Sequence, residues 1–135
     1  MKLLVDTSVW SLALRRDDCS EEEQNIVELL SEYIKNGHAC IIGPIRQEIL
    51  SGIKNRKQFL SLQKHLSYFE DLSISTEMYV QAAEFYNKCR NKGIQGSHID
   101  FLICAVAQTY NLHIFTIDKD FLRFSTVIDI RIFPQ

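Results

Sequence analysis

Four carboxylate residues stand where predicted strands end or predicted helices begin: Asp6, Glu48, Asp100 and Asp118. Asp6 directly follows an apolar run that ends in the β-branched Val5, a pattern typical of a short buried strand. Carboxylates crowded together raise one another's pKa values unless a cation lies among them, and oxygen-only ligands select a hard ion, Mg²⁺ or Mn²⁺. Such an ion orients and activates water for attack on a phosphodiester.

Each acid also has a simpler interpretation when it is taken alone. Asp6 suits a helix cap, Asp100 suits the dipole at a helix start, and Asp118 suits a turn. Glu48 suits a solvated helix face. In a parallel α/β sheet, however, the carboxyl ends of the strands and the N-termini of the crossover helices meet at one edge. We therefore expect all four acids at that edge, which favours a shared chemical role.

Hydrophobic periodicity predicts the elements that would position these acids. Strands are expected up to residue 5 and over residues 38–42, 112–116 and 127–133, with a short edge strand over 72–75. Helices are expected over residues 8–16, 20–34, 44–52, 55–69, 76–93 and 98–110, with a turn or short helix over 118–124. Strands that alternate with helices predict an α/β fold with a parallel sheet covered on both faces. The length predicts one domain, residues 1–135.

Composition narrows the class of protein further. No apolar run approaches the length of a membrane span and no signal peptide is visible, so we expect a cytoplasmic protein with no membrane contact. The four cysteines are scattered and lack zinc spacing. The formal charge of −2 argues against a broad nucleic-acid-binding coat but permits local basic surfaces.

Taken together, the motifs resemble those of a PIN domain over nearly the full chain. They are Asp6-Thr7-Ser8, Arg46-Gln47-Glu48, the helix opening around Asp100, and Thr116-Ile117-Asp118. A single short PIN domain is similar to VapC, the ribonuclease toxin of bacterial toxin–antitoxin pairs. The resemblance implies a three-layer α/β/α sandwich with a mainly parallel central sheet and Mg²⁺- or Mn²⁺-dependent RNA endonuclease activity. It also implies a homodimer and a cognate VapB-type antitoxin.

The resemblance assigns roles to the acids by position. Asp6 and Asp100 are the first choices for direct metal ligands. Glu48 and Asp118 would complete the catalytic cluster, binding the ion directly or through water. Asp120 lies only two residues from Asp118, and we favour Asp118 because one acid of that turn is enough to face the metal.

Further residues would support the cluster or contact the substrate. Ser8 and Thr116 resemble the hydroxyls that hydrogen-bond within such a site. Arg46 is the first candidate for an RNA contact, because it lies near the predicted acidic edge and phosphate needs local positive charge. Other basic candidates are Arg15-Arg16, Lys54, Arg56, Lys57 and Lys64.

Other functions stay open at this stage. A Mg²⁺-dependent phosphatase or phosphotransfer domain also places an aspartate after its first strand, although Asp6-Thr7-Ser8 lacks a second aspartate two residues on. An RNA-processing PIN nuclease that is not a toxin would carry the same acids. A catalytically silent module that receives a basic peptide in an acidic groove is the third alternative.

Overall fold

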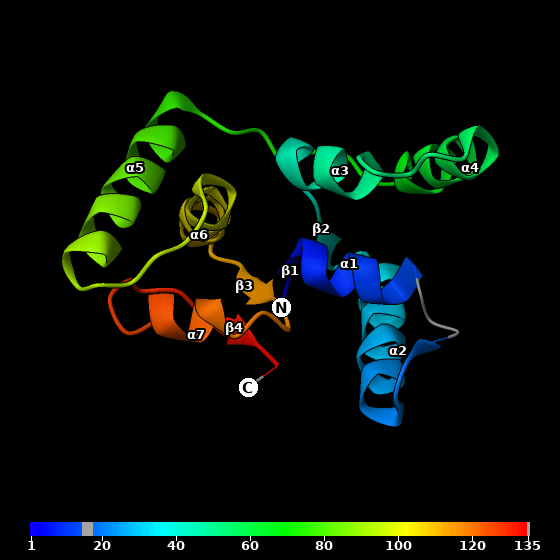
Figure 1. Cartoon of the computed structure of the whole chain (residues 1–135), viewed down its shortest axis with the longest axis horizontal. Coiled ribbons are helices and arrows are strands. Elements are labelled where there is room, and N and C mark those ends of the chain that lie inside the picture. Colours follow the sequence, from blue (N-terminus) through cyan, green and yellow to red (C-terminus); the bar gives the residue numbers. More distant parts are fainter. Residues whose placement is uncertain (15–17, 135) are drawn as a thin grey trace.

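The computed structural model describes residues 1–14 and 18–134. Its sheet has four strands among these residues, all parallel, in the order β2-β1-β3-β4 (Figure 1). They are β1 (Leu3–Val5), β2 (Ala39–Cys40), β3 (His113–Phe115) and β4 (Ile132–Phe133). The prediction of a parallel α/β fold is confirmed.

Helices join these strands, and their starts follow from local sequence signals. Ser20 and Glu23 form a capping box at α2, and Ser97 and Asp100 form another at α6. None of the described helices is long and apolar enough to cross a membrane. The helices are α1 (Thr7–Leu14), α2 (Glu21–Lys35), α3 (Gly43–Leu50), α4 (Arg56–Leu66), α5 (Thr76–Asn91), α6 (His98–Tyr110) and α7 (Asp120–Phe124).

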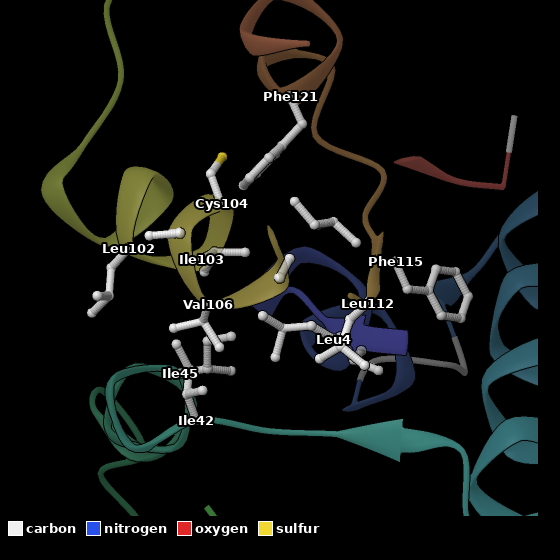
Figure 2. Packing of buried hydrophobic residues seen from close by; sticks show 14 of the residues in the cluster. Leu4, Ile42, Ile45, Leu102, Ile103, Cys104, Val106, Leu112, Phe115 and Phe121 are labelled. Atoms are coloured by element: carbon white, nitrogen blue, oxygen red, sulfur yellow. The ribbon is translucent and has the colours of Figure 1, made fainter. Parts of the chain in front are cut away.

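The layers form a three-layer α/β/α arrangement around the short sheet. Helix α6 packs on β3 and α5 packs on α6, while α2 contacts β2 and α1 contacts both α2 and α3. Strand β1 lies at the centre, and its Leu3, Leu4 and Val5 are fully buried. Figure 2 shows the core that results, in which residues of β1, β3, α3, α6 and α7 meet. The site is therefore carried by the most buried strand of the fold.

The register of β1 and β3 determines which residues lie side by side where the two strands end. Val5 of β1 pairs with Phe115 of β3 in a parallel ladder. The ladder continues by one hydrogen bond, from the backbone N–H of Asp6 to the carbonyl of Phe115 at 2.9 Å. Asp6 and Thr116 therefore lie beside each other at the carboxyl edge of the sheet.

Two predicted strands are wrong or shortened. Residues 72–75 form no strand; the chain there makes one parallel bridge, between Ile41 and Asp71, before Ser75 caps α5. The last strand begins at Ile132 and not at residue 127, because the chain continues from α7 in turns in which the backbone N–H groups of Val127 and Ile128 donate to the Phe124 carbonyl. The predicted end of the first helix at residue 16 and the Arg15-Arg16 patch lie outside the described residues.

Candidate active site

The carboxylate of Asp6 is held at the end of β1 by two hydroxyl groups. Ser8 Oγ and Thr116 Oγ1 donate to the same carboxylate oxygen, Oδ2, at 2.7 and 2.8 Å. Asp6 is only 6% exposed. Burial raises the pKa of Asp6 above its ordinary value, and the hydrogen bonds from Ser8 and Thr116 lower it in part. Asp6 is therefore a desolvated carboxylate, with one oxygen fixed by the protein.

The same two hydroxyls also hold the segment that carries Asp118. Thr116 Oγ1 accepts from the backbone N–H of Asp118 at 3.0 Å, and Ser8 Oγ accepts from that of Ile117 at 3.2 Å. Asp118 Oδ1 accepts from the backbone N–H of Asp120 at 2.9 Å. Ser8 and Thr116 thus connect Asp6 with the segment that carries Asp118.

Asp100 approaches the same edge from the start of α6. Its Oδ2 accepts from the backbone N–H of Ser97, and its own N–H donates to Ser97 Oγ, both at 3.1 Å. Burial raises the pKa of Asp100, the bonds to Ser97 lower it, and the negative charges of Asp6 and Asp118 raise it further. The structure therefore brings Asp6, Asp100 and Asp118 within electrostatic reach of one another.

Ser97 has a second role beyond the predicted cap, because it holds the carboxylate of Asp100 in place. The spacing Ser97-x-x-Asp100 is a capping-box signal that identifies this bond from sequence. Capping and metal binding are compatible here. The capping bond occupies Oδ2 of Asp100, and the other oxygen has no hydrogen-bond partner in the described part of the chain.

The donor set fits a hard divalent cation. Each of the three aspartates uses one carboxylate oxygen for its hydrogen bonds at the site: Oδ2 of Asp6, Oδ2 of Asp100 and Oδ1 of Asp118. No lysine or arginine forms an ion pair with them within residues 1–14 and 18–134. No three described histidine, cysteine or acidic side chains form a ready-made metal cluster. Mg²⁺ typically takes one or two carboxylates directly and keeps several waters, so two direct ligands suffice.

Glu48 is not brought into contact with the three aspartates. It is exposed in the second turn of α3, and it has no hydrogen bond or ion pair to another described residue. The charges that act on Asp100 come from Asp6 and Asp118. The electrostatic contacts thus connect Asp6, Asp100 and Asp118, and the role of Glu48 stays a prediction.

Arg46 has an intramolecular role that the sequence pattern did not reveal. Its guanidinium donates to the carbonyls of Leu66 and Phe69 at 2.8 and 2.7 Å and to Asp71 Oδ1 at 3.0 Å. It fastens α3 to the end of α4, and these contacts occupy donors that an RNA phosphate would need. Arg46 therefore has a structural role in joining these segments, and its predicted contact with RNA stays a prediction.

Asp120 is engaged differently from Asp118. Its Oδ1 accepts from Arg123 in a surface ion pair of 2.6 Å, and its backbone caps the turn at Asp118. An acid already paired with arginine is a poorer metal ligand than one with an unbonded oxygen. The geometry is consistent with the preference for Asp118.

A parallel α/β sheet with one buried and two partly buried aspartates at its carboxyl edge defines a class of protein with an acidic, oxygen-ligand site. The model of the PIN domain family matches residues 3–127. The chain belongs to the PIN domain family. This is a family of nucleases that generally use divalent metals. No curated protein matched the chain.

Solved structures share the fold at low sequence identity. FitAcB from Neisseria gonorrhoeae is similar with a TM-score of 0.75 and 21% identity, covering 97% of this chain and 96% of that one. VapBC2 from Rickettsia felis, bound to a DNA fragment from their promoter, gives 0.71 and 20%, covering 98% and 97%. VapBC-1 from nontypeable Haemophilus influenzae gives 0.74 and 14%, covering 97% and 96%. At these identities the similarity establishes the fold.

Proposed function

We propose that the chain is a Mg²⁺- or Mn²⁺-dependent endoribonuclease and the toxin of a toxin–antitoxin pair. The observation that carries the proposal is the convergence of three aspartates at one sheet edge, two of them with pKa values raised by burial. Such a cluster costs free energy unless a cation is bound, and PIN domains are a nuclease family. The VapBC and FitAcB names of the structural neighbours support the toxin role.

The chain's own residues have distinct tasks in this proposal. Asp6 and Asp100 offer carboxylate oxygens as direct ligands, and Asp118 acts directly or through water. Ser8 and Thr116 hold the carboxylate of Asp6 by donating to its Oδ2. When bound, the divalent ion supplies activation of a water molecule and neutralisation of charge on the phosphodiester. Glu48 stays a prediction as a ligand through water.

The test is incubation of the purified chain with total cellular RNA in Mg²⁺, in Mn²⁺ and in chelator, followed by mapping of the cut ends. We expect cuts at few sites that need the metal and disappear in Asp6→Ala and Asp100→Asn. The exposed Asp129 provides a matched control, and Asp129→Asn should cleave like the wild type. Cleavage that survives in Asp100→Asn would refute the assignment, and hydrolysis of small phosphomonoesters alone would favour the phosphatase.

An antitoxin needs a surface to bind, and the described part of the chain offers an apolar groove of about 410 Å³ between α1, α2 and α4. Leu14 and Tyr68 at this groove are 51% and 69% exposed. We propose that an apolar segment of the VapB-type antitoxin covers it. Leu62→Glu, inside the groove, should abolish co-purification with the antitoxin, whereas Leu122→Glu, an exposed leucine on α7, should not.

The homodimer also belongs to this proposal. Tyr79 and Val80 on α5 are 54% and 53% exposed, beside a cavity of about 250 Å³ lined by apolar residues of α3, α5 and α6. This face is the candidate contact with a second copy. Sedimentation equilibrium measures the mass, and Val80→Glu should shift a dimer towards the monomer.

A further inference from the structure

A small cavity lies next to the acidic edge, between the C-terminal part of α5 and the loop that leads into α6. Its volume is about 180 Å³. Pockets for drug-sized ligands begin at roughly 300 Å³, so this one suits a single ring system. Figure 1 shows the loop passing from the end of α5 to α6 close to α7. The lining residues are Tyr86, Arg90, Ile94, Gln95, Gly96 and Phe101.

Aromatic rings form one wall of this cavity. Tyr86 and Phe101 meet edge to face with their centroids 5.6 Å apart. Tyr86 is also stacked on His98 at 4.9 Å with an interplanar angle of 17°. The Arg90 guanidinium also lies over the Tyr86 ring, 5.8 Å from its centroid. Tyr86 is therefore held by its neighbours and forms a rigid wall of the cavity.

Polar groups suited to reading a base edge stand at the rim. Arg90 is exposed, and one of its guanidinium nitrogens donates to the Tyr86 hydroxyl at 2.8 Å, which holds the side chain over the cavity. Gln95 is exposed and has no bond to any described residue. An arginine fork offers donors only, and guanine is the base whose O6 and N7 both accept.

The loop couples this cavity to the acidic edge. Gly96 lines the cavity, and the next residue, Ser97, holds the carboxylate of Asp100. A Cβ at Gly96 would lie 2.5 Å from Phe124 Cζ, so the loop can run this close to α7 only with glycine. The cavity is therefore bounded by the loop that positions Asp100 and by Phe101, the residue that follows Asp100.

We propose that this cavity binds one unpaired base of the RNA substrate, with guanine preferred, and that Arg90 and Gln95 set the base preference of cleavage. The inference rests on the proposed ribonuclease function and adds the residues that choose the cut site. Tyr86 and Phe101 form the rigid wall of the site, and Arg90 and Gln95 supply the contacts to the base edge.

The experiment measures base preference around the cut in a pool of short single-stranded RNAs with randomised positions. We expect the wild type to enrich guanine at one fixed position beside the cut. Arg90→Lys keeps the charge but loses the fork, and it should reduce this preference by at least about 5-fold, as should Gln95→Ala. Lys88→Ala removes a charge from the same helix end outside the cavity, and it should keep the preference.

A second measurement separates failure of the inference from failure of the ribonuclease proposal. Titration of the wild type with 5′-GMP and with 5′-AMP is followed through the backbone amide signals of Gln95 and Gly96. Selective shifts with 5′-GMP support the base site even if no RNA is cut. Unchanged base preference in both variants, loss of preference in Lys88→Ala, or no shift with 5′-GMP would overturn it.

Discussion

Thr116→Val tests how the hydroxyl groups of the site control the charge of Asp6. Thr116 Oγ1 donates to Asp6 Oδ2 at 2.8 Å and accepts from the backbone N–H of Asp118 at 3.0 Å. Valine keeps the branched shape and loses both bonds. Thr116 is only 6% exposed, so water has little access to replace the missing hydroxyl.

The size of the effect follows from the partners that remain. A hydrogen bond to a charged group contributes about 1.5–3 kcal/mol. Ser8 Oγ still donates to the same oxygen at 2.7 Å, so we expect the lower end, about 1.5 kcal/mol or roughly 10-fold in cation affinity. Burial already raises the pKa of Asp6 and the hydroxyls lower it. Removal of one hydroxyl therefore raises this pKa further, and the cation then needs a higher pH to bind.

The assay is calorimetric titration with Mn²⁺ at several pH values. Thr116→Val should bind about 10-fold more weakly near neutral pH, and its binding midpoint should move to higher pH. Thr126→Val is a matched control, because the Thr126 hydroxyl is exposed and donates only to the carbonyl of Arg123. If Thr116→Val binds Mn²⁺ like the wild type with the same midpoint, the hydroxyls do not control Asp6.

Three further predictions concern stability. Without metal, burial holds the pKa of Asp6 in the folded protein above 3.8, so the free energy of unfolding falls as the pH rises from 3.8 through the folded pKa. Asp6→Asn should show a flatter curve of melting temperature against pH. Equal curves for the variant and the wild type would contradict this. Gly96→Ala should cost about 1–3 kcal/mol in urea unfolding because its Cβ meets Phe124, and Gly43→Ala, which meets no atom closer than 3.8 Å, should be neutral. Gly96→Ala should cost less in a Phe124→Leu background than in the wild type, because leucine lacks the atoms that the new Cβ meets. Arg46→Lys loses the guanidinium group and should lower the free energy of unfolding by about 1.5–3 kcal/mol. An unchanged unfolding midpoint would show that Arg46 does not stabilise the contact between α3 and the end of α4.

The elements nearest the site are those that the sequence predicts best. Strand β1 and the α6 start at Ser97 carry local signals, an apolar run that stops at an acid and a capping box. The parallel topology then places Asp6, Asp100 and Asp118 at one edge without any further information. The last strand begins later than residue alternation predicts, because Val127 and Ile128 bond to the Phe124 carbonyl in turns that alternation does not encode.

The features of the site that the sequence does not predict arise from contacts between segments that are far apart in the chain. Arg46 donates to backbone carbonyls 20 and 23 residues further along the chain. Because every residue has a backbone carbonyl, the residue types do not indicate which carbonyl will accept. Tyr86 and His98 stack across a helix boundary, although their spacing suggests a core residue and a surface residue. Glu48 matches the family motif by position, yet its orientation depends on how α3 packs.

The central claim is that a water molecule activated at the acidic site attacks the RNA phosphodiester directly. It is tested most directly with a short RNA that carries a single 2′-deoxy sugar at the mapped cut site. Attack by water does not need the 2′-hydroxyl, so we expect metal-dependent cleavage of this substrate by the wild type and none by Asp100→Asn. An uncut 2′-deoxy substrate, or a 2′,3′-cyclic phosphate at the ends of the unmodified RNA, would contradict the account.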